Sequence, residues 1–188
     1  MSQPLRILAI SGSLRAGSSN TAALQALSML APADVLVKLF TQLTDLPYFN
    51  PDLDETERLP TTVRAFRTQV GEADGLLICS PEYAHGVPGV LKNALDWLVG
   101  SVEFPYKPVA LINISPRSIH AHASLVEILT TMSAALIAHP AFTIALPRNR
   151  LDVAGMLEDP SIRAALETAM EAFVQALKEV KDVPFSSG

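Results

Sequence analysis

A loop rich in hydroxyl side chains at residues 11–21 has the composition of a phosphate site, and its sequence is SGSLRAGSSNT. Gly12 and Gly17 allow tight turns and a close approach of the backbone to a ligand. Free amides at the start of the helix expected next attract an anion, and Arg15 adds a fixed positive charge with forked donors. Four hydroxyl groups can donate to phosphate oxygens, those of Ser13, Ser18, Ser19 and Thr21. The loop therefore predicts a site for a terminal phosphate monoester.

Three kinds of phosphate site compete for this loop. A nucleoside-triphosphate loop needs G-x-x-x-x-G-K-[ST], but Ser18 stands where the lysine belongs. A dinucleotide loop needs G-x-G-x-x-G, but Leu14 stands at the second glycine, and no acidic residue closes the second predicted strand in the expected way. A mononucleotide phosphate is left, together with the simpler alternative of a Ser/Gly-rich turn that only caps a helix.

A second loop, residues 80–89, reads SPEYAHGVPG and is stiffened by two prolines and shaped by two glycines. Such a loop presents backbone amides and carbonyls, which suits a flat polar heterocycle. Tyr83 either stacks on that ring or packs under the loop. Glu82 is either a general base or a carboxylate that fixes the loop, and we favour the second. His85 is either a proton donor or a contact to a neighbouring subunit.

The two loops and their surroundings resemble the NAD(P)H-dependent FMN reductase family, which also includes quinone, azo-dye and chromate reductases. The family pattern reads G-S-L-R-x-x-S-x-N for the phosphate and P-E-Y-N-x-x-x-P-G-x-L-K-N-A-x-D-W for the flavin ring. The residues that carry the resemblance here are 12–15, Ser18, Asn20, 81–83, 88–89, 91–94 and 96–97, with 47–53 similar to the family's loop after the second strand. The chain departs from the pattern at Ala84, usually Asn, and at 115–118, where SPRS replaces a Gly-rich stretch.

The resemblance implies that FMN is held by its phosphate at the first loop and by its isoalloxazine ring at the second. NADPH or NADH is then the co-substrate in a ping-pong cycle, in which hydride passes to the flavin and an electron acceptor replaces the oxidised nicotinamide. No catalytic side chain and no metal are expected, because the cofactor carries the chemistry. The expected cofactor-binding residues are Ser13, Arg15, Ser18, Ser19, Asn20, Thr21, Pro81, Glu82, Tyr83, Ala84, His85, Gly86 and Ser115.

The acceptor and the assembly stay open at this point. Free flavin, a quinone or an azo compound would each serve as the small-molecule acceptor, and a non-enzymatic electron carrier of flavodoxin type is the alternative from another class. Relatives form dimers and tetramers, so a homodimer or homotetramer is expected. The apolar helix at 91–99 is the candidate interface, and Trp97 on it is expected to pack in the core or against a subunit.

Five short apolar runs alternate with segments of helical period, the pattern of strand–helix units on a parallel sheet. The runs are 6–11, 35–40, 75–80, 109–115 and 141–146, and the helices are expected at 20–30, 59–72, 90–99, 122–137 and from Pro160 to about Val180. Asp159 is the expected cap of the last helix. We expect an α/β protein, a flavodoxin-like three-layer sandwich with strand order 2-1-3-4-5 and helices on both faces. In that order both loops meet at the switch point of the sheet.

Composition agrees with one compact domain spanning residues 1–188, with a loose tail at 181–188. The chain has 188 residues, is 49% hydrophobic and carries a net charge of −5 without any basic cluster, which speaks against nucleic acid and membrane partners. Cys79 is the single cysteine, so no internal disulfide forms, and a cytoplasmic location is expected. His120 and His122 are two apart on a predicted helix with no evident third ligand, which does not predict a metal site.

Overall fold

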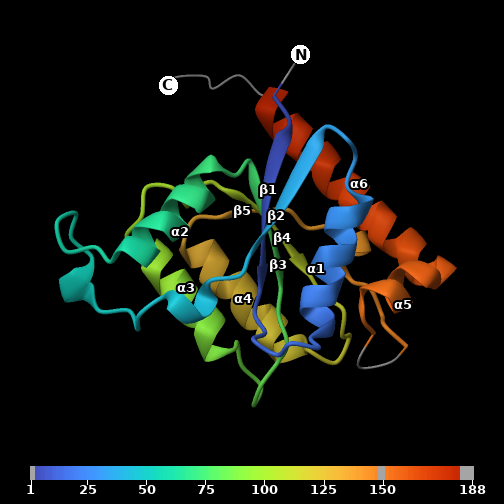
Figure 1. Ribbon diagram of the computed structural model, residues 1–188, viewed down its shortest axis with the longest axis horizontal. Helices are drawn as coiled ribbons and strands as arrows, with labels where there is room; N and C mark the ends of the chain where they lie inside the picture. The colour runs from blue at the N-terminus through green and yellow to red at the C-terminus, as the bar shows by residue number, and fades with distance from the viewer. Residues whose placement is uncertain (1–2, 148–150, 183–188) are drawn as a thin grey trace.

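A computed structural model of the chain describes residues 3–147 and 151–182. Its centre is a five-stranded parallel sheet with the order β2-β1-β3-β4-β5 (Figure 1). The predicted strand order is therefore confirmed. The strands are β1 (Leu5–Ser11), β2 (Val35–Phe40), β3 (Gly75–Cys79), β4 (Pro108–Ile112) and β5 (Ala135–Leu136).

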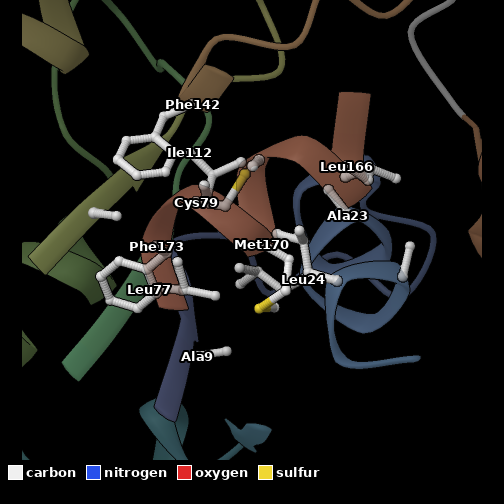
Figure 2. Close-up of a cluster of buried hydrophobic side chains, with 14 of the residues drawn as sticks. Ala9, Ala23, Leu24, Leu77, Cys79, Ile112, Phe142, Leu166, Met170 and Phe173 are labelled. Atoms are coloured by element: carbon white, nitrogen blue, oxygen red, sulfur yellow. The ribbon is translucent and has the colours of Figure 1, made fainter. Parts of the chain in front are cut away.

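Helices cover both faces of the sheet and complete three layers (Figure 1). One face carries α1 (Ser19–Leu30), α5 (Val153–Glu158) and α6 (Pro160–Asp182), and the other carries α2 (Thr61–Glu72), α3 (Gly89–Val99) and α4 (Ile119–Thr131). Alternate residues of a strand point to opposite faces, so β1 and β3 supply side chains to two separate cores. Figure 2 shows part of the first core, where strand residues meet α1 and α6.

The last helix begins where the sequence predicts. The Asp159 carboxylate accepts hydrogen bonds from the backbone amides of Ser161 at 2.9 Å and Ile162 at 3.1 Å. Bonds from the Ser161 hydroxyl and the Ile162 amide hold the pKa of Asp159 below its usual value. The helix extends to Asp182, so the first two residues of the predicted loose tail are helical, and the others lie outside the described residues. None of the helices in the described ranges is long and apolar enough to cross a membrane.

The fifth strand is not where the sequence predicts it. β5 falls within residues 122–137, which were expected to be helical throughout. α4 instead ends at Thr131, and Ser133, at a φ of 61°, reverses the chain so that β5 can pair with β4. A two-residue edge strand leaves almost no apolar pattern to detect, so the helical period of its neighbours dominates.

The segment predicted as the fifth strand, residues 141–146, still lies beside β4. It overlaps a short 3-10 helix, η3 (Pro140–Phe142), and joins the sheet only through one bridge between Thr143 and Asn113. Pro140 lacks a backbone donor and so cannot continue a ladder from β5. The β-rich composition therefore indicated the correct edge of the sheet but the wrong residues.

The predicted interface helix is committed to the core of its own protomer. Leu91, Leu95 and Trp97 of α3 are each at most 1% exposed within a single chain. The core packing predicted for Trp97 is confirmed, and the apolar stripe of α3 cannot also form a subunit contact.

Candidate active site

The first loop leaves the sheet at the switch point, between β1 and β3. Ser11 lies opposite Cys79 in the parallel register, and the Gly12 amide donates to the Cys79 carbonyl at 2.9 Å. A Cβ on Gly12 would lie 2.3 Å from the Ser80 hydroxyl oxygen, so no larger residue fits. Gly12 is therefore required for the packing of the first loop against Ser80, and its predicted approach to a ligand stays a prediction. Gly17 has open space around it and an ordinary φ, so it needs no such freedom.

The first turn of α1 offers a set of donors to an anion. Ser18 caps the helix by accepting from the Thr21 amide at 3.4 Å. The amides of Ser19 and Asn20 have no hydrogen-bond partner among residues 3–147 and 151–182. Arg15 is exposed and forms no ion pair with any described residue. Free amides at a helix N-terminus, hydroxyls and an unpaired guanidinium together favour a phosphate.

Thr21 points away from this donor set. Its hydroxyl lies 2.7 Å from the hydroxyl of Ser11, which is buried at the end of β1. Thr21 therefore ties the start of α1 to the sheet, a structural role that the sequence pattern did not distinguish from ligand binding.

The second loop turns back at a hairpin-like pair formed by Tyr83 and Gly86. The Tyr83 amide donates to the Gly86 carbonyl at 3.1 Å, and the Gly86 amide donates back at 2.9 Å. The two central residues, Ala84 and His85, have φ values of 50° and 57°. A turn with both central residues at positive φ strongly favours Asn at its first position. This accounts for Asn in the family pattern at position 84 without a flavin contact, and Ala is the less favourable residue there.

Two contacts anchor the second loop to α4. The Glu82 carboxylate accepts from the Ala121 amide at 2.8 Å and so caps α4, whose own N-cap residue, Ser118, makes no side-chain cap bond. The rings of His85 and His120 stack with centroids 4.2 Å apart and planes inclined by 22°. The interpretation of Glu82 as a loop-fixing carboxylate is confirmed.

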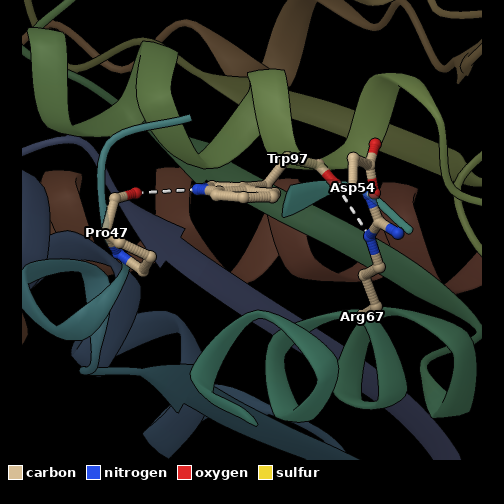
Figure 3. Close-up of polar contacts among 4 residues, drawn as sticks. All are labelled: Pro47, Asp54, Arg67 and Trp97. Carbon is tan, nitrogen blue, oxygen red and sulfur yellow. Dashed lines mark hydrogen bonds and ion pairs between the residues drawn. The ribbon is translucent and has the colours of Figure 1, made fainter. Parts of the chain in front are cut away.

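A third loop, after β2, is held by the second half of the flavin motif (Figure 3). The Trp97 indole donates to the Pro47 carbonyl at 2.8 Å, and the Asn93 side-chain amide donates to the same oxygen at 3.0 Å. Arg67 donates through two nitrogens to the Trp97 carbonyl and pairs with Asp54 at 2.7 Å. Asn93 and Trp97, the two motif residues, therefore hold the loop after β2 against α3. Neither lines the cavity between the first and second loops.

The loops after β1 and β3 meet the segments after β4 and η3 around an open cavity of about 340 Å³. Nine of the thirteen predicted site residues line it: Ser13, Arg15, Ser18, Ser19, Asn20, Pro81, Glu82, Tyr83 and Ser115. Thr21, Ala84, His85 and Gly86 do not. Four lining residues are not among the predicted site residues: Ser80, Ile114, Ser118 and Leu146, although Ser80 and Ser118 lie in loops that the sequence analysis singled out. For Ser80 a signal was available, since it directly follows an apolar strand at the switch point.

The residues of the cavity fit a flavin mononucleotide. The donors are concentrated at the Arg15 and α1 end, as a phosphate requires. Ile114, Leu146 and the half-exposed Tyr83 supply apolar surface for an aromatic ring. Among the described residues no three His, Cys, Asp or Glu side chains come together as a metal site.

Comparisons with known proteins agree with this geometry. Residues 5–147 match the family model described as NADPH-dependent FMN reductase. A quinone reductase of Escherichia coli (strain K12) is 34% identical over 188 residues, covering 96% of this chain and 100% of the relative. A 2-hydroxy-1,4-benzoquinone reductase of a Burkholderia species is 34% identical over 181 residues, covering 93% and 97%.

A solved structure with a similar fold is the flavoenzyme NAD(P)H:(acceptor) oxidoreductase of Paracoccus denitrificans. Its TM-score is 0.81 at 27% identity, over 93% of this chain and 98% of that one. The family match covers most of the chain, and the relatives align from end to end. The chain therefore belongs to the NADPH-dependent FMN reductase family.

Proposed function

We propose that this chain holds FMN in the cavity between the first and second loops and uses NAD(P)H to reduce a small quinone by a ping-pong cycle. The observation that carries the proposal is the convergence of an anion-binding helix start and a backbone-presenting loop on one cavity at the switch point. Two relatives of similar length are named as reductases of quinones, which supports the choice of acceptor.

The phosphate group is assigned to the first loop. The amides of Ser19 and Asn20 and the hydroxyls of Ser13 and Ser18 supply hydrogen-bond donors, and Arg15 supplies the compensating charge. Hydrogen bonds to a charged group contribute about 1.5–3 kcal/mol each. The phosphate should therefore contribute a large share of the affinity.

The ring is assigned to the wall formed by residues 81–83 together with Ser115 and Leu146. FMN, when bound there, would supply the redox chemistry of hydride uptake from NAD(P)H and delivery to the acceptor. The chain itself binds and orients the reactants. Glu82 lines the cavity, but its carboxylate caps α4, and we assign it no proton transfer.

The residues outside the cavity wall receive positioning roles. Ala84, His85 and Gly86 form the turn that holds Tyr83 at the cavity, and Thr21 fixes the start of α1. The ring stack between His85 and His120 adds a second attachment of that turn to α4. We therefore count these four residues as supports of the cofactor site.

A homodimer or homotetramer and a cytoplasmic location complete the proposal. The apolar face of α3 is buried, so the support for an oligomer shifts to the exposed apolar side chains at the end of α3 and after it, Val99, Val102 and Tyr106. Sedimentation velocity measures the assembly directly. A species of monomer mass across the micromolar range would contradict the oligomer.

Steady-state kinetics test the function. FMN-loaded protein should oxidise NAD(P)H in the presence of a soluble benzoquinone. Double-reciprocal plots of initial rate against NAD(P)H concentration, taken at several fixed quinone concentrations, should be parallel, as in a ping-pong cycle. Intersecting plots would contradict the proposed order. An FMN-loaded protein that exchanges electrons with a chemical reductant but never oxidises NADPH or NADH would instead be an electron carrier.

A further inference from the structure

The single cysteine lies between the core and the cavity. Cys79 ends β3, is fully buried, and packs among strand and helix side chains (Figure 2). Its thiol donates to the side-chain oxygen Oδ1 of Asn20 at 3.2 Å. Burial raises the pKa of the Cys79 thiol far above its usual value, so the group keeps the proton that this bond requires.

Asn20 is the residue at the other end of this bond, and it lines the cavity from the first turn of α1. Oδ1 and Nδ2 diverge from one carbon, so a contact that fixes Oδ1 on the core side leaves Nδ2 on the other side. No hydrogen bond to Nδ2 is found within residues 3–147 and 151–182. The amide nitrogen is therefore available as a donor beside the unpaired amides of Ser19 and Asn20.

We infer that Cys79 is a positioning residue of the cofactor site, whose thiol holds the Asn20 side-chain amide with its nitrogen toward the phosphate. The inference rests on the proposed function, because it assumes an anion at the start of α1. A flipped amide would present Oδ1 to the phosphate oxygens, which replaces an attraction with a repulsion.

The position demands a group that is both apolar and a donor. The neighbours of Cys79 in the core are hydrophobic side chains, including Leu77 and Ile112. A thiol packs like a small hydrophobe and still offers a weak S–H donor. Alanine would keep the apolar packing and remove the donor. Serine would keep a donor and replace the apolar thiol with a polar hydroxyl, so the two substitutions separate packing from hydrogen bonding.

The test measures FMN affinity by fluorescence titration of the apoprotein. We expect Cys79→Ala to weaken FMN binding about 3- to 10-fold, the range of one lost hydrogen bond. Cys79→Ser should stay within about twofold of wild type by the same reasoning. Ile112→Val is the matched control, because it loosens the same cluster without touching Asn20, and it should leave FMN affinity unchanged. An equal loss in Ile112→Val and Cys79→Ala would overturn the inference in favour of packing.

A double-mutant cycle gives the decisive comparison. In an Asn20→Ala background, Cys79→Ala should produce no additional loss of FMN affinity, since its partner is already gone. The same loss in both backgrounds would overturn the inference. If wild type and Cys79→Ala bind FMN equally well, only the role of Cys79 is refuted. If the wild-type protein binds no FMN, the proposed function and this inference are refuted together.

A vibrational measurement on folded protein needs no cysteine variant. The chain has one cysteine, so its S–H stretching band in the Raman spectrum is unambiguous. The band should lie at lower frequency in wild type than in Asn20→Ala, because a hydrogen bond weakens the S–H bond. An identical band in both proteins would overturn the assignment.

Discussion

The role of Glu82 separates two accounts of this site. In one, its carboxylate only caps α4; in the other, it is a catalytic acid or base. Its carboxylate accepts from the Ala121 amide at 2.8 Å, and the residue at the N-cap of α4, Ser118, offers no side-chain cap in its place. Hydrogen bonds to charged groups contribute about 1.5–3 kcal/mol, and this partly buried site should fall at the lower end. We therefore expect Glu82→Ala to reduce the free energy of unfolding by about 1.5–2 kcal/mol.

Glu82→Gln is the matched variant, because it keeps an acceptor and removes the charge. Its loss should be about 0.5–1 kcal/mol, with the difference reflecting the charge at a helix N-terminus. Urea denaturation of the apoproteins measures both losses, and stopped-flow flavin reduction by NAD(P)H measures activity at saturating FMN. Reduction rates within about tenfold of wild type are expected, well short of the range for a lost general acid or base. Unchanged stability with a reduction rate lowered a hundredfold or more would refute the capping account and make Glu82 catalytic.

Three further substitutions test the loops around the cavity. Arg67→Met leaves the partly buried Asp54 carboxylate without its partner and should lower the free energy of unfolding by about 2 kcal/mol in thermal denaturation, while a loss below about 0.5 kcal/mol would contradict a structural pair. Ala84→Asn should raise stability by about 0.5 kcal/mol, because Asn tolerates positive φ, and a decrease in the same assay would argue against the turn. His85→Ala should retain flavin reduction within about tenfold, whereas a thousandfold loss with normal FMN binding would place His85 among the catalytic residues.

The central strands could be predicted from the sequence because burial on both faces leaves near-continuous apolar runs, whereas the order of the strands came from the likeness to flavodoxin-like sheets. β1 and β3 show this pattern, and every residue of β3 is buried. The edge of the sheet carried no comparable signal, since β5 has two residues and lies next to an amphipathic helix. α5 was missed for a related reason, because its six residues span too few turns to show a period.

The site was predictable in its loops and unpredictable in its long-range contacts. The phosphate loop combines glycine, hydroxyls and a cation within a few residues, so its chemistry is local. The bond from Ala121 to Glu82 spans 39 residues, and the bond from Cys79 to Asn20 spans 59. Leu146 reaches the cavity only because the chain detours through η3. Positive φ at Ala84 was also hidden, because alanine rarely adopts this conformation, whereas histidine, the residue at position 85, is enriched there.

The most direct test of the phosphate site compares FMN with riboflavin, which lacks the phosphate. Titration of the apoprotein should show one FMN site per chain and riboflavin binding weaker by well over about tenfold, since each lost charged hydrogen bond costs about 1.5–3 kcal/mol. Arg15→Ala should weaken FMN binding by about 10- to 100-fold on the same estimate and leave riboflavin binding unchanged. Equal affinity for FMN and riboflavin in the wild-type protein would contradict the assignment of the first loop to a phosphate.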